Sequence, residues 1–178
     1  MTILAIDPGT VQCGWVLYDA GKVHESGLMA NTDMLAHLVR APDKTRTLAI
    51  EMIASYGMAV GREVFETCVW IGRFKQAWFD PDAVRLIYRG QVKQFLCRSA
   101  RAKDANIRQA LIDLVGPQGV KAKPGPTYGV RSHAWAALAV AVTADAMASP
   151  DSIAPGLFAP AHPDPAAREL FETEEVPF

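Results

Sequence analysis

Three short apolar runs, separated by turn sequences, occupy the first 30 residues and restrict the fold more than any other feature. Residues 2–6 and 14–19 read as strands, and a turn signal at 19–21 leads into a third strand near 22–29. Short strands with such short connections favour an antiparallel meander. The chain therefore begins as a sheet, and later segments have to cover its faces.

Further along the chain, predicted helices alternate with two more strands. The segments "RTLAIE" and "AVRLIY" read as buried strands, because each is a short apolar run between turn signals. Helices are predicted over 33–40, 62–79, 103–115 and 132–148, with a shorter one in "QVKQFL" and a loop over 116–131. Asn31 or Thr32 is the expected N-cap of the first helix, and Ser132 that of the last. This order predicts an α/β fold, with a mixed sheet and helices on its faces.

The helix predicted over 62–79 is apolar around most of its circumference. Such a helix is buried on more than one side, so we expect the sheet to cover one side and a second subunit to cover another. Trp70, Trp78 and Trp135 have apolar neighbours at helical spacing and are expected in the core or in subunit contacts.

Length and composition indicate one domain followed by a tail. A chain of 178 residues, 50% of them hydrophobic, suffices for one well-buried core, which we expect over residues 1–148. Because proline and acidic residues dominate the remainder, residues 149–178 are expected to form a flexible tail. The three cysteines form no CxxC pair, which argues against a disulfide framework or a zinc site and favours the cytoplasm. We also expect no signal segment and no membrane span.

The net charge of -1 hides an uneven distribution of charge along the chain. Residues 84–131 hold ten Lys and Arg but only two acidic residues, whereas residues 151–178 hold one basic and six acidic residues. The basic segment is a candidate phosphate-binding surface. The alternative is that its Lys and Arg side chains only solvate helix faces.

Two carboxylates follow apolar strand residues, and their positions indicate chemistry. Asp7 ends the first run, before Pro8-Gly9-Thr10, and Glu51 ends "LAIE". If the two strands are parallel neighbours, both side chains emerge at the same edge of the sheet. A partly buried carboxylate pair needs a shared cation, and such oxygen ligands suit Mg²⁺. The alternatives are a turn residue for Asp7 and a structural salt bridge to an arginine for Glu51.

Four motifs, in order, resemble a known family. The motifs are "AIDPGTVQCGW", "LAIE", "YRGQVKQFLCRSARAKDANIRQALID" and "SHAWAALAVAV". Together, over about residues 1–145, they resemble RuvC-type Holliday-junction resolvases of the ribonuclease H-like superfamily, especially the short phage and prophage branch. The resemblance implies a five-stranded mixed sheet, with a three-stranded antiparallel meander and two parallel strands, in a protein of the bacterial or phage-infected cytosol. It also implies a homodimer that nicks opposed strands of a four-way DNA junction with Mg²⁺, for which Mn²⁺ can substitute.

The resemblance carries over to particular residues. Asp7 and Glu51 match the first two catalytic, metal-binding acids, and Lys93 and Lys103 match basic positions beside the cleaved phosphate. His133 occupies the first of two positions, three residues apart, at which the family has an Asp or His followed by an Asp. His133 is therefore a candidate metal ligand and proton-transfer group.

At the second of these two positions the chain has Ala136, so one acid of the family pattern is missing. Asp104, at the start of a predicted helix in the basic segment, is a candidate to supply the missing charge as a catalytic metal ligand. Its alternative role is that of an N-cap. This departure from the pattern makes the number of metal ions an open question.

The candidate DNA-binding residues come mainly from the basic segment. Tyr56, just after Glu51, is a candidate for stacking on bases at the crossover, with packing in its loop as the alternative. The full candidate set is Tyr56, Arg89, Lys93, Arg98, Arg101, Lys103, Lys121, Lys123 and Arg131.

The final residues "ETEEVPF" resemble the acidic C-terminal tip of bacterial single-stranded-DNA-binding proteins, which recruits repair enzymes. A protein partner for this tip is one interpretation, and a solubilising tail or a competitor with DNA for the basic segment are others. For the domain, the leading hypothesis is a junction-resolving endonuclease. The alternatives are a ribonuclease H-like nuclease acting on an RNA/DNA hybrid, a flap or structured RNA, and a non-catalytic junction-binding protein.

Overall fold

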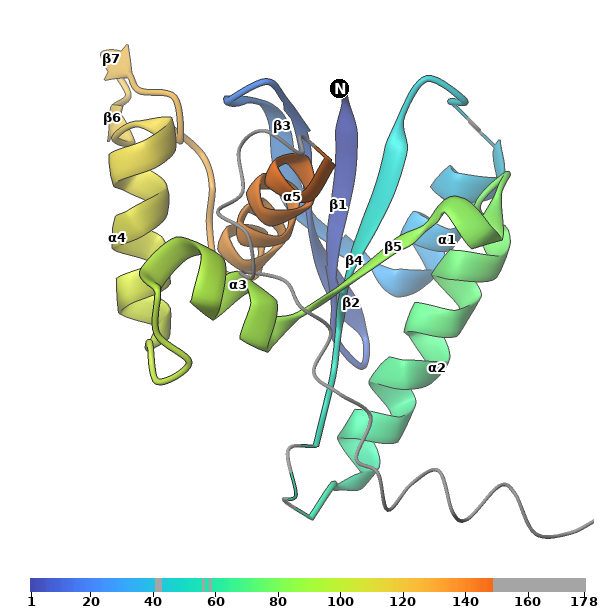
Figure 1. Ribbon diagram of the computed structural model, residues 1–178. Coiled ribbons are helices and arrows are strands. Elements are labelled where there is room, and N and C mark those ends of the chain that lie inside the picture. The colour runs from blue at the N-terminus through green and yellow to red at the C-terminus, as the bar shows by residue number, and fades with distance from the viewer. Residues whose placement is uncertain (41–42, 56, 58, 149–178) are drawn as a thin grey trace, which may run out of the picture.

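Five strands form one mixed sheet in the order β3-β2-β1-β4-β5 (Figure 1). The computed structural model describes residues 1–148 except 41–42, 56 and 58. The strands are β1 (Ile3–Pro8), β2 (Gln12–Asp19), β3 (Lys22–Ala30), β4 (Thr47–Met52) and β5 (Arg85–Tyr88). Strands β1, β2 and β3 form an antiparallel meander, and β4 lies parallel to both β1 and β5. The predicted fold class, a five-stranded mixed sheet with two added parallel strands, is confirmed.

Helices cover both faces of this sheet (Figure 1). One face packs against α1 (Asn31–Arg40) and α2 (Arg62–Ala77). The other face packs against α5 (Ala134–Ala148), with α3 (Arg89–Cys97) and α4 (Asp104–Val115) on the outer side of α5. A short 3₁₀ helix, η1 (Pro81–Ala83), precedes β5. The segment 116–131, predicted as a loop, also contains a small hairpin of β6 (Gly119–Val120) and β7 (Lys123–Pro124).

Alternation along the two central strands sorts their side chains between the two cores. Leu4 and Ile6 of β1, like Leu48 and Ile50 of β4, belong to the apolar cluster under α1 and α2. Ala5 and its register partner Ala49 belong to the cluster under α5. Residues one position beyond Ile6 and Ile50 are therefore directed to the side of α5.

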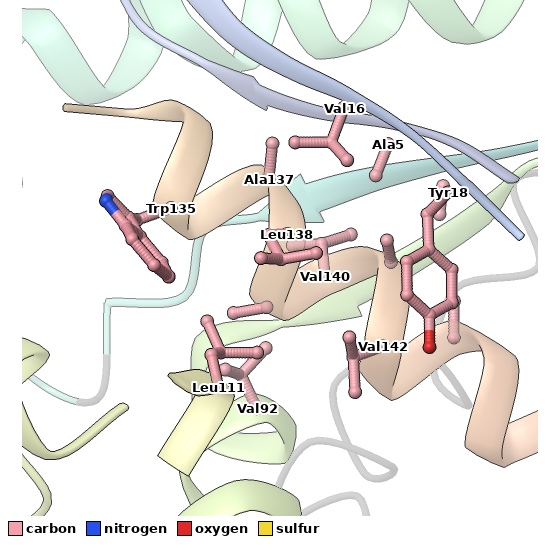
Figure 2. Close-up of a cluster of buried hydrophobic side chains, with 14 of the residues drawn as sticks. Ala5, Val16, Tyr18, Val92, Leu111, Trp135, Ala137, Leu138, Val140 and Val142 are labelled. Carbon is pink, nitrogen blue, oxygen red and sulfur yellow. The ribbon is translucent and has the colours of Figure 1, made fainter. Parts of the chain in front are cut away.

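Small side chains let α5 approach the sheet closely. Ala5 of β1 lies opposite Ala137 and its neighbours on α5, and Leu138 and Val142 extend toward the outer helices (Figure 2). From Ala134 to Ala144, every α5 residue except Ala136 is buried. The apolar sequence of α5 therefore reflects burial on nearly all sides. Among the residues that the structure describes, no helix is long and apolar enough to cross a membrane.

Two expected N-caps are wrong. The last helix begins at Ala134, and Ser132 lies before it with a φ of 44°, in the left-handed region, whereas an N-cap residue has extended backbone. Asn31 is the first residue of α1, and its side-chain amide donates to the Gly9 carbonyl at 2.9 Å instead of capping the helix. The Asn31 side chain thus holds the turn after Asp7, a contact that local sequence patterns do not reveal.

Gly14 allows the start of α5 to cross β2. It pairs with Asp7 in the register of β1 and β2. A Cβ atom built on Gly14 would lie 2.3 Å from the carbonyl carbon of His133 and 2.6 Å from the backbone nitrogen of Ala134. Any larger residue at this position therefore pushes the α5 start away from β1.

We expect Gly14→Ala to destabilise the protein by about 1–3 kcal/mol, because backbone atoms cannot yield as a flexible side chain can. Urea unfolding followed by circular dichroism measures this difference. Gly61→Ala is the matched control, since nothing lies within 4 Å of a Cβ atom there, and it should cost no more than about 1 kcal/mol. Equal losses in the two variants would contradict the close approach at Gly14.

Candidate active site

Asp7 and Glu51 lie side by side at the carboxyl ends of neighbouring parallel strands. Each is one residue beyond the last β1–β4 register pair, Ile6 with Ile50. Strand alternation directs both side chains to the face that α5 covers. Both are poorly exposed, at 14% for the Asp7 side chain and 10% for that of Glu51. The predicted juxtaposition of the two carboxylates at one sheet edge is therefore present.

The turn after Asp7 is anchored from two sides. The Gly9 amide donates to the Gln12 carbonyl at 3.0 Å, which closes the turn. The Asn31 side chain donates to the Gly9 carbonyl at 2.9 Å, and the Trp70 indole donates to the Thr10 carbonyl at 3.0 Å. These bonds fix the strand end that carries Asp7. We expected Trp70 in the core or in subunit contacts, and the sequence has no signal for this role.

His133 approaches Asp7 from the layer of α5, which covers this face of the sheet. Its Nδ1 lies 3.1 Å from Oδ2 of Asp7, although the two residues are 126 positions apart in sequence. The turn before α5 is closed by the Ala134 amide, which donates to the Arg131 carbonyl at 2.9 Å. The His133 side chain is 57% exposed, so its ring is open to solvent on the side away from the carboxylate. His133 thus joins the two acids, just before the helix and not on it.

Arg89 and Asp104 complete the polar cluster. Arg89 is the first residue of α3, directly after β5, and its Nη1 donates to Oε1 of Glu51 at 3.1 Å. Its other terminal nitrogen, Nη2, donates to Oδ1 of Asp104. Asp104 is the first residue of α4, with Lys103 in the N-cap position. The arginine partner that sequence analysis kept open for Glu51 therefore exists, and it holds Asp104 as well.

These side chains line a cleft of about 650 Å³. Arg108 also lines it, one helical turn after Asp104, stacked 4.7 Å above the Trp135 ring and bonded to Gln118 at 3.0 Å. Ala136 forms part of the wall. The sequence could have indicated Arg108, because residues i and i+4 share a helix face.

The pKa of Asp7 is raised from its ordinary value of 3.8 to about 8, chiefly by burial. The charge of the neighbouring Glu51, a hydrogen bond with it and the charge of Asp104 contribute to this rise, whereas Arg89 opposes it. Two carboxylates in one poorly solvated place cannot both ionise without a compensating cation. The cluster is therefore short of positive charge despite Arg89.

The donor set fits a magnesium ion that keeps part of its water shell. Within the described ranges, no group of three or more His, Cys, Asp or Glu side chains is arranged to hold a metal ion by itself. Mg²⁺ commonly binds one or two protein carboxylates and takes its remaining ligands from water and substrate phosphate. Asp7 and Glu51 meet that requirement, and the raised pKa of Asp7 is the property that a bound cation would relieve.

The candidate DNA-binding residues fall into two groups in space. The first group follows β5 in the chain: Lys93 lies on α3, Arg98 and Arg101 in or next to the connection from α3 to α4, and Lys103 directly before α4, and none of the four lines the cleft. Lys121 and Lys123 lie on the β6–β7 hairpin, which Figure 1 shows at the opposite end of α4. Arg131 directly precedes Ser132 and His133, which line the cleft. The structure thus brings Arg89 to the acids, whereas the other described candidates do not line the cleft. Tyr56 lies outside the described residues.

Comparison with known proteins identifies the fold. No family model matches this sequence, and no curated protein matches it. The structure of Thermus thermophilus RuvC in complex with a Holliday junction substrate is similar, with a TM-score of 0.61 and 20% sequence identity over 85% of this chain and 97% of that one. A second Thermus thermophilus RuvC structure gives a TM-score of 0.57 and 19% identity over 80% of this chain and 92% of that one. The chain therefore has the ribonuclease H-like fold of RuvC.

The raised pKa of Asp7 predicts that Asp7→Asn stabilises the metal-free protein. Well below pH 3.8, Asp7 is protonated in both the folded and the unfolded chain. Between its ordinary pKa of 3.8 and the folded value of about 8, only the unfolded chain ionises, so wild-type stability falls as pH rises. We expect the variant to gain on the order of 2 kcal/mol at pH 9 and little at pH 4.

Urea unfolding in a chelating buffer at pH 4, 6, 7.5 and 9 tests this prediction. Asp82→Asn is the control, since it makes the same change at an exposed position and should shift stability little at any of these pH values. A stability gain for Asp7→Asn that does not grow with pH would contradict the raised pKa.

Proposed function

We propose that this protein is a magnesium-dependent, structure-selective DNA endonuclease that resolves four-way junctions by phosphodiester hydrolysis. The observation that carries the proposal is the convergence of Asp7, Glu51 and His133 on one cleft from three separate segments of the chain. The RuvC-like fold and the ordered sequence motifs support it. The same motifs support the finer assignment to the phage and prophage branch, and hence to the bacterial or phage-infected cytosol.

Asp7 and Glu51 would hold the divalent ion, Mg²⁺ or in its place Mn²⁺. When bound, this ion supplies the Lewis-acid chemistry of phosphodiester hydrolysis. Asp7 is suited to the task because the Asn31 and Trp70 bonds fix the turn that follows it. Asp104 is a weaker candidate ligand, because it is 85% exposed and paired with Arg89.

His133 is proposed to move a proton during hydrolysis. When Asp7 is ionised, Nδ1–H of His133 donates to it, and this bond fixes the tautomer that leaves Nε2 free to accept a proton. A neutral imidazole near pH 7 is a suitable general base. The exposure of the ring allows the proton to leave to solvent.

The basic residues around the cleft are proposed to bind the DNA backbone. Lys93, Arg98, Arg101 and Lys103 lie on α3 or between α3 and Asp104, the first residue of α4, which lines the cleft. Lys and Arg side chains there would neutralise phosphates and release counterions. Lys121 and Lys123, at the far end of α4, are placed to contact an arm of the junction away from the crossover. Arg131 lies between the two groups. Tyr56 and the C-terminal tip, for which a protein partner is proposed, lie outside the described residues.

A homodimer is proposed because one active site nicks one strand and a junction needs two nicks. The outer face of α2 exposes Phe65 and Val69, one helical turn apart, and a Cβ atom at Gly72 on the next turn would meet nothing within 4 Å. With a two-fold axis near Val69, the exposed Phe65 ring of each copy lies over the open surface at Gly72 of the other. The second subunit expected for this helix would cover this apolar face.

Asp7→Asn and Glu51→Gln are each expected to reduce magnesium-dependent nicking of a four-way junction to the background rate, because each removes a charged ligand of the ion. Junction binding, measured by gel shift in Ca²⁺ or chelator, should persist. His133→Ala should slow nicking by about 10²–10⁴-fold if its ring transfers the proton. Nicking that survives either acid replacement contradicts the metal site.

The same assay identifies the substrate. Purified wild-type protein with Mg²⁺ is incubated with a matched four-way junction, a flap, a duplex and an RNA/DNA hybrid. Preference for the junction is expected, whereas preference for the hybrid or flap favours a ribonuclease H-like nuclease of another specificity. Junction binding without nicking of any substrate favours a non-catalytic junction-binding protein.

Phe65→Glu is expected to convert a dimer into monomers, because it replaces an apolar ring by a charge within the proposed interface. Sedimentation equilibrium measures the mass of each species. Leu114→Glu on α4 is the matched control, since Leu114 and Phe65 are each 61% exposed, and it should leave the dimer intact. A wild-type protein that is monomeric at micromolar concentration would refute this interface.

A further inference from the structure

Arg89 links two carboxylates across the cleft, and this bridge indicates more than a general affinity for DNA. Nη1 of Arg89 donates to Glu51 at 3.1 Å, while Nη2 donates to Asp104. Because different nitrogens make the two bonds, one bond can break while the other remains. The inference drawn from this arrangement rests on the proposed function.

The two ends of the bridge lie in different environments. The Glu51 side chain is 10% exposed and lies beside Asp7, whereas the Asp104 side chain is 85% exposed. A charge that is poorly solvated requires a partner, while an exposed ion pair adds little stability. Arg89 is therefore held where it is chiefly by the need of Glu51 for a counter-ion.

A divalent cation at Asp7 and Glu51 would meet the same need with twice the charge. Arg89 also lowers the pKa of Asp7, although it does not overcome the effects of burial and of Glu51. The guanidinium and the ion therefore compete for one carboxylate. Once the ion holds Glu51, Asp104 retains Arg89 at the wall of the same cleft.

A guanidinium released in this way is well placed for a phosphate. Its planar set of N–H donors matches two phosphate oxygens at once, which an ammonium group cannot do. Ala136 lines the same cleft with a small side chain and brings no acid of its own. We propose that Arg89 is the internal counter-ion of Glu51 in the metal-free protein, and that ion binding transfers its free donors to the scissile phosphate.

Metal binding without DNA tests the first half of this proposal. Free Mn²⁺ is titrated by electron paramagnetic resonance against wild-type protein, Arg89→Gln and Arg108→Gln. Arg108 lines the same cleft but bonds to Gln118, so its removal changes the charge equally without freeing Glu51. We expect Arg89→Gln to tighten Mn²⁺ binding about tenfold, and Arg108→Gln about twofold or less. Equal tightening in the two variants, or weaker binding in Arg89→Gln, overturns the competition.

Nicking at saturating Mn²⁺ tests the second half. Arg89→Gln should nick at least about 100-fold more slowly than wild type although it binds the ion more tightly. If Arg89 served only to hold the fold, its replacement would not strengthen ion binding while slowing nicking. Arg89→Lys keeps the charge and protects folding. We expect this variant to bind Mn²⁺ with wild-type affinity but to nick at less than a tenth of the wild-type rate. Full activity in either variant overturns the phosphate role.

The metal titration remains informative if the proposed function fails. Should wild-type protein nick no substrate, the endonuclease assignment falls, while the difference between Arg89→Gln and Arg108→Gln in Mn²⁺ affinity still decides whether Arg89 competes with an ion for Glu51. Conversely, normal nicking with no such difference in Mn²⁺ affinity contradicts the proposed role of Arg89 and supports the endonuclease assignment.

Discussion

The close packing of α5 on the central strands is the constraint on which the site depends. Ala5 and Ala49 present almost no side chain to the helix, and Gly14 presents none, so the helix start can cross the sheet directly above the end of β1. His133 reaches Asp7 only because of this approach. The same contacts make α5 nearly inaccessible to water, which explains why its sequence is apolar on all sides. The packing of α5 on the sheet therefore determines the geometry of the site.

The site concentrates negative charge where the fold can least solvate it. Asp7 and Glu51 point into the α5 layer at the level where the apolar core ends, and the raised pKa of Asp7 reflects the poor solvation of this pair. A sequence selected only for stability would place neutral or apolar residues there. Charged residues at a position where they destabilise the fold are typical of functional sites. Their placement is stronger support for chemistry at this position than the Asp-Pro-Gly turn, which is ordinary in loops.

The strands and the acid pair were predictable because they depend on local periodicity. A run of alternating or wholly apolar residues between turn signals defines a strand, and a carboxylate that directly follows such a run must lie at the strand end. The register that makes Asp7 and Glu51 neighbours requires only that β1 and β4 be adjacent and parallel. His133 depended on the family resemblance, because nothing local indicates which strand a helix start will meet.

The contacts made by Arg89, Arg108, Asn31 and Trp70 were not predictable in this way. Each joins segments brought together by tertiary packing, with sequence separations of up to 60 residues for the Trp70–Thr10 bond. The basic segment was recognised as a unit, yet its members divide between the cleft and the β6–β7 hairpin. Composition can identify a positively charged stretch, but only the path of the chain decides which of its charges reach the acids.

The charges in the cleft also bear on the number of metal ions. One cleft is lined by three carboxylates and two guanidinium groups, those of Asp7, Glu51, Asp104, Arg89 and Arg108. The His133 imidazole, which can take up a proton, lines the same cleft. Two divalent ions would need further anionic ligands, and Ala136 supplies none. Under the proposed function, one ion on the paired acids and Arg89 on the substrate would place two cations beside the phosphate. An arginine held by Asp104 would then take the place of a second ion, which would give the departure at Ala136 a physical explanation.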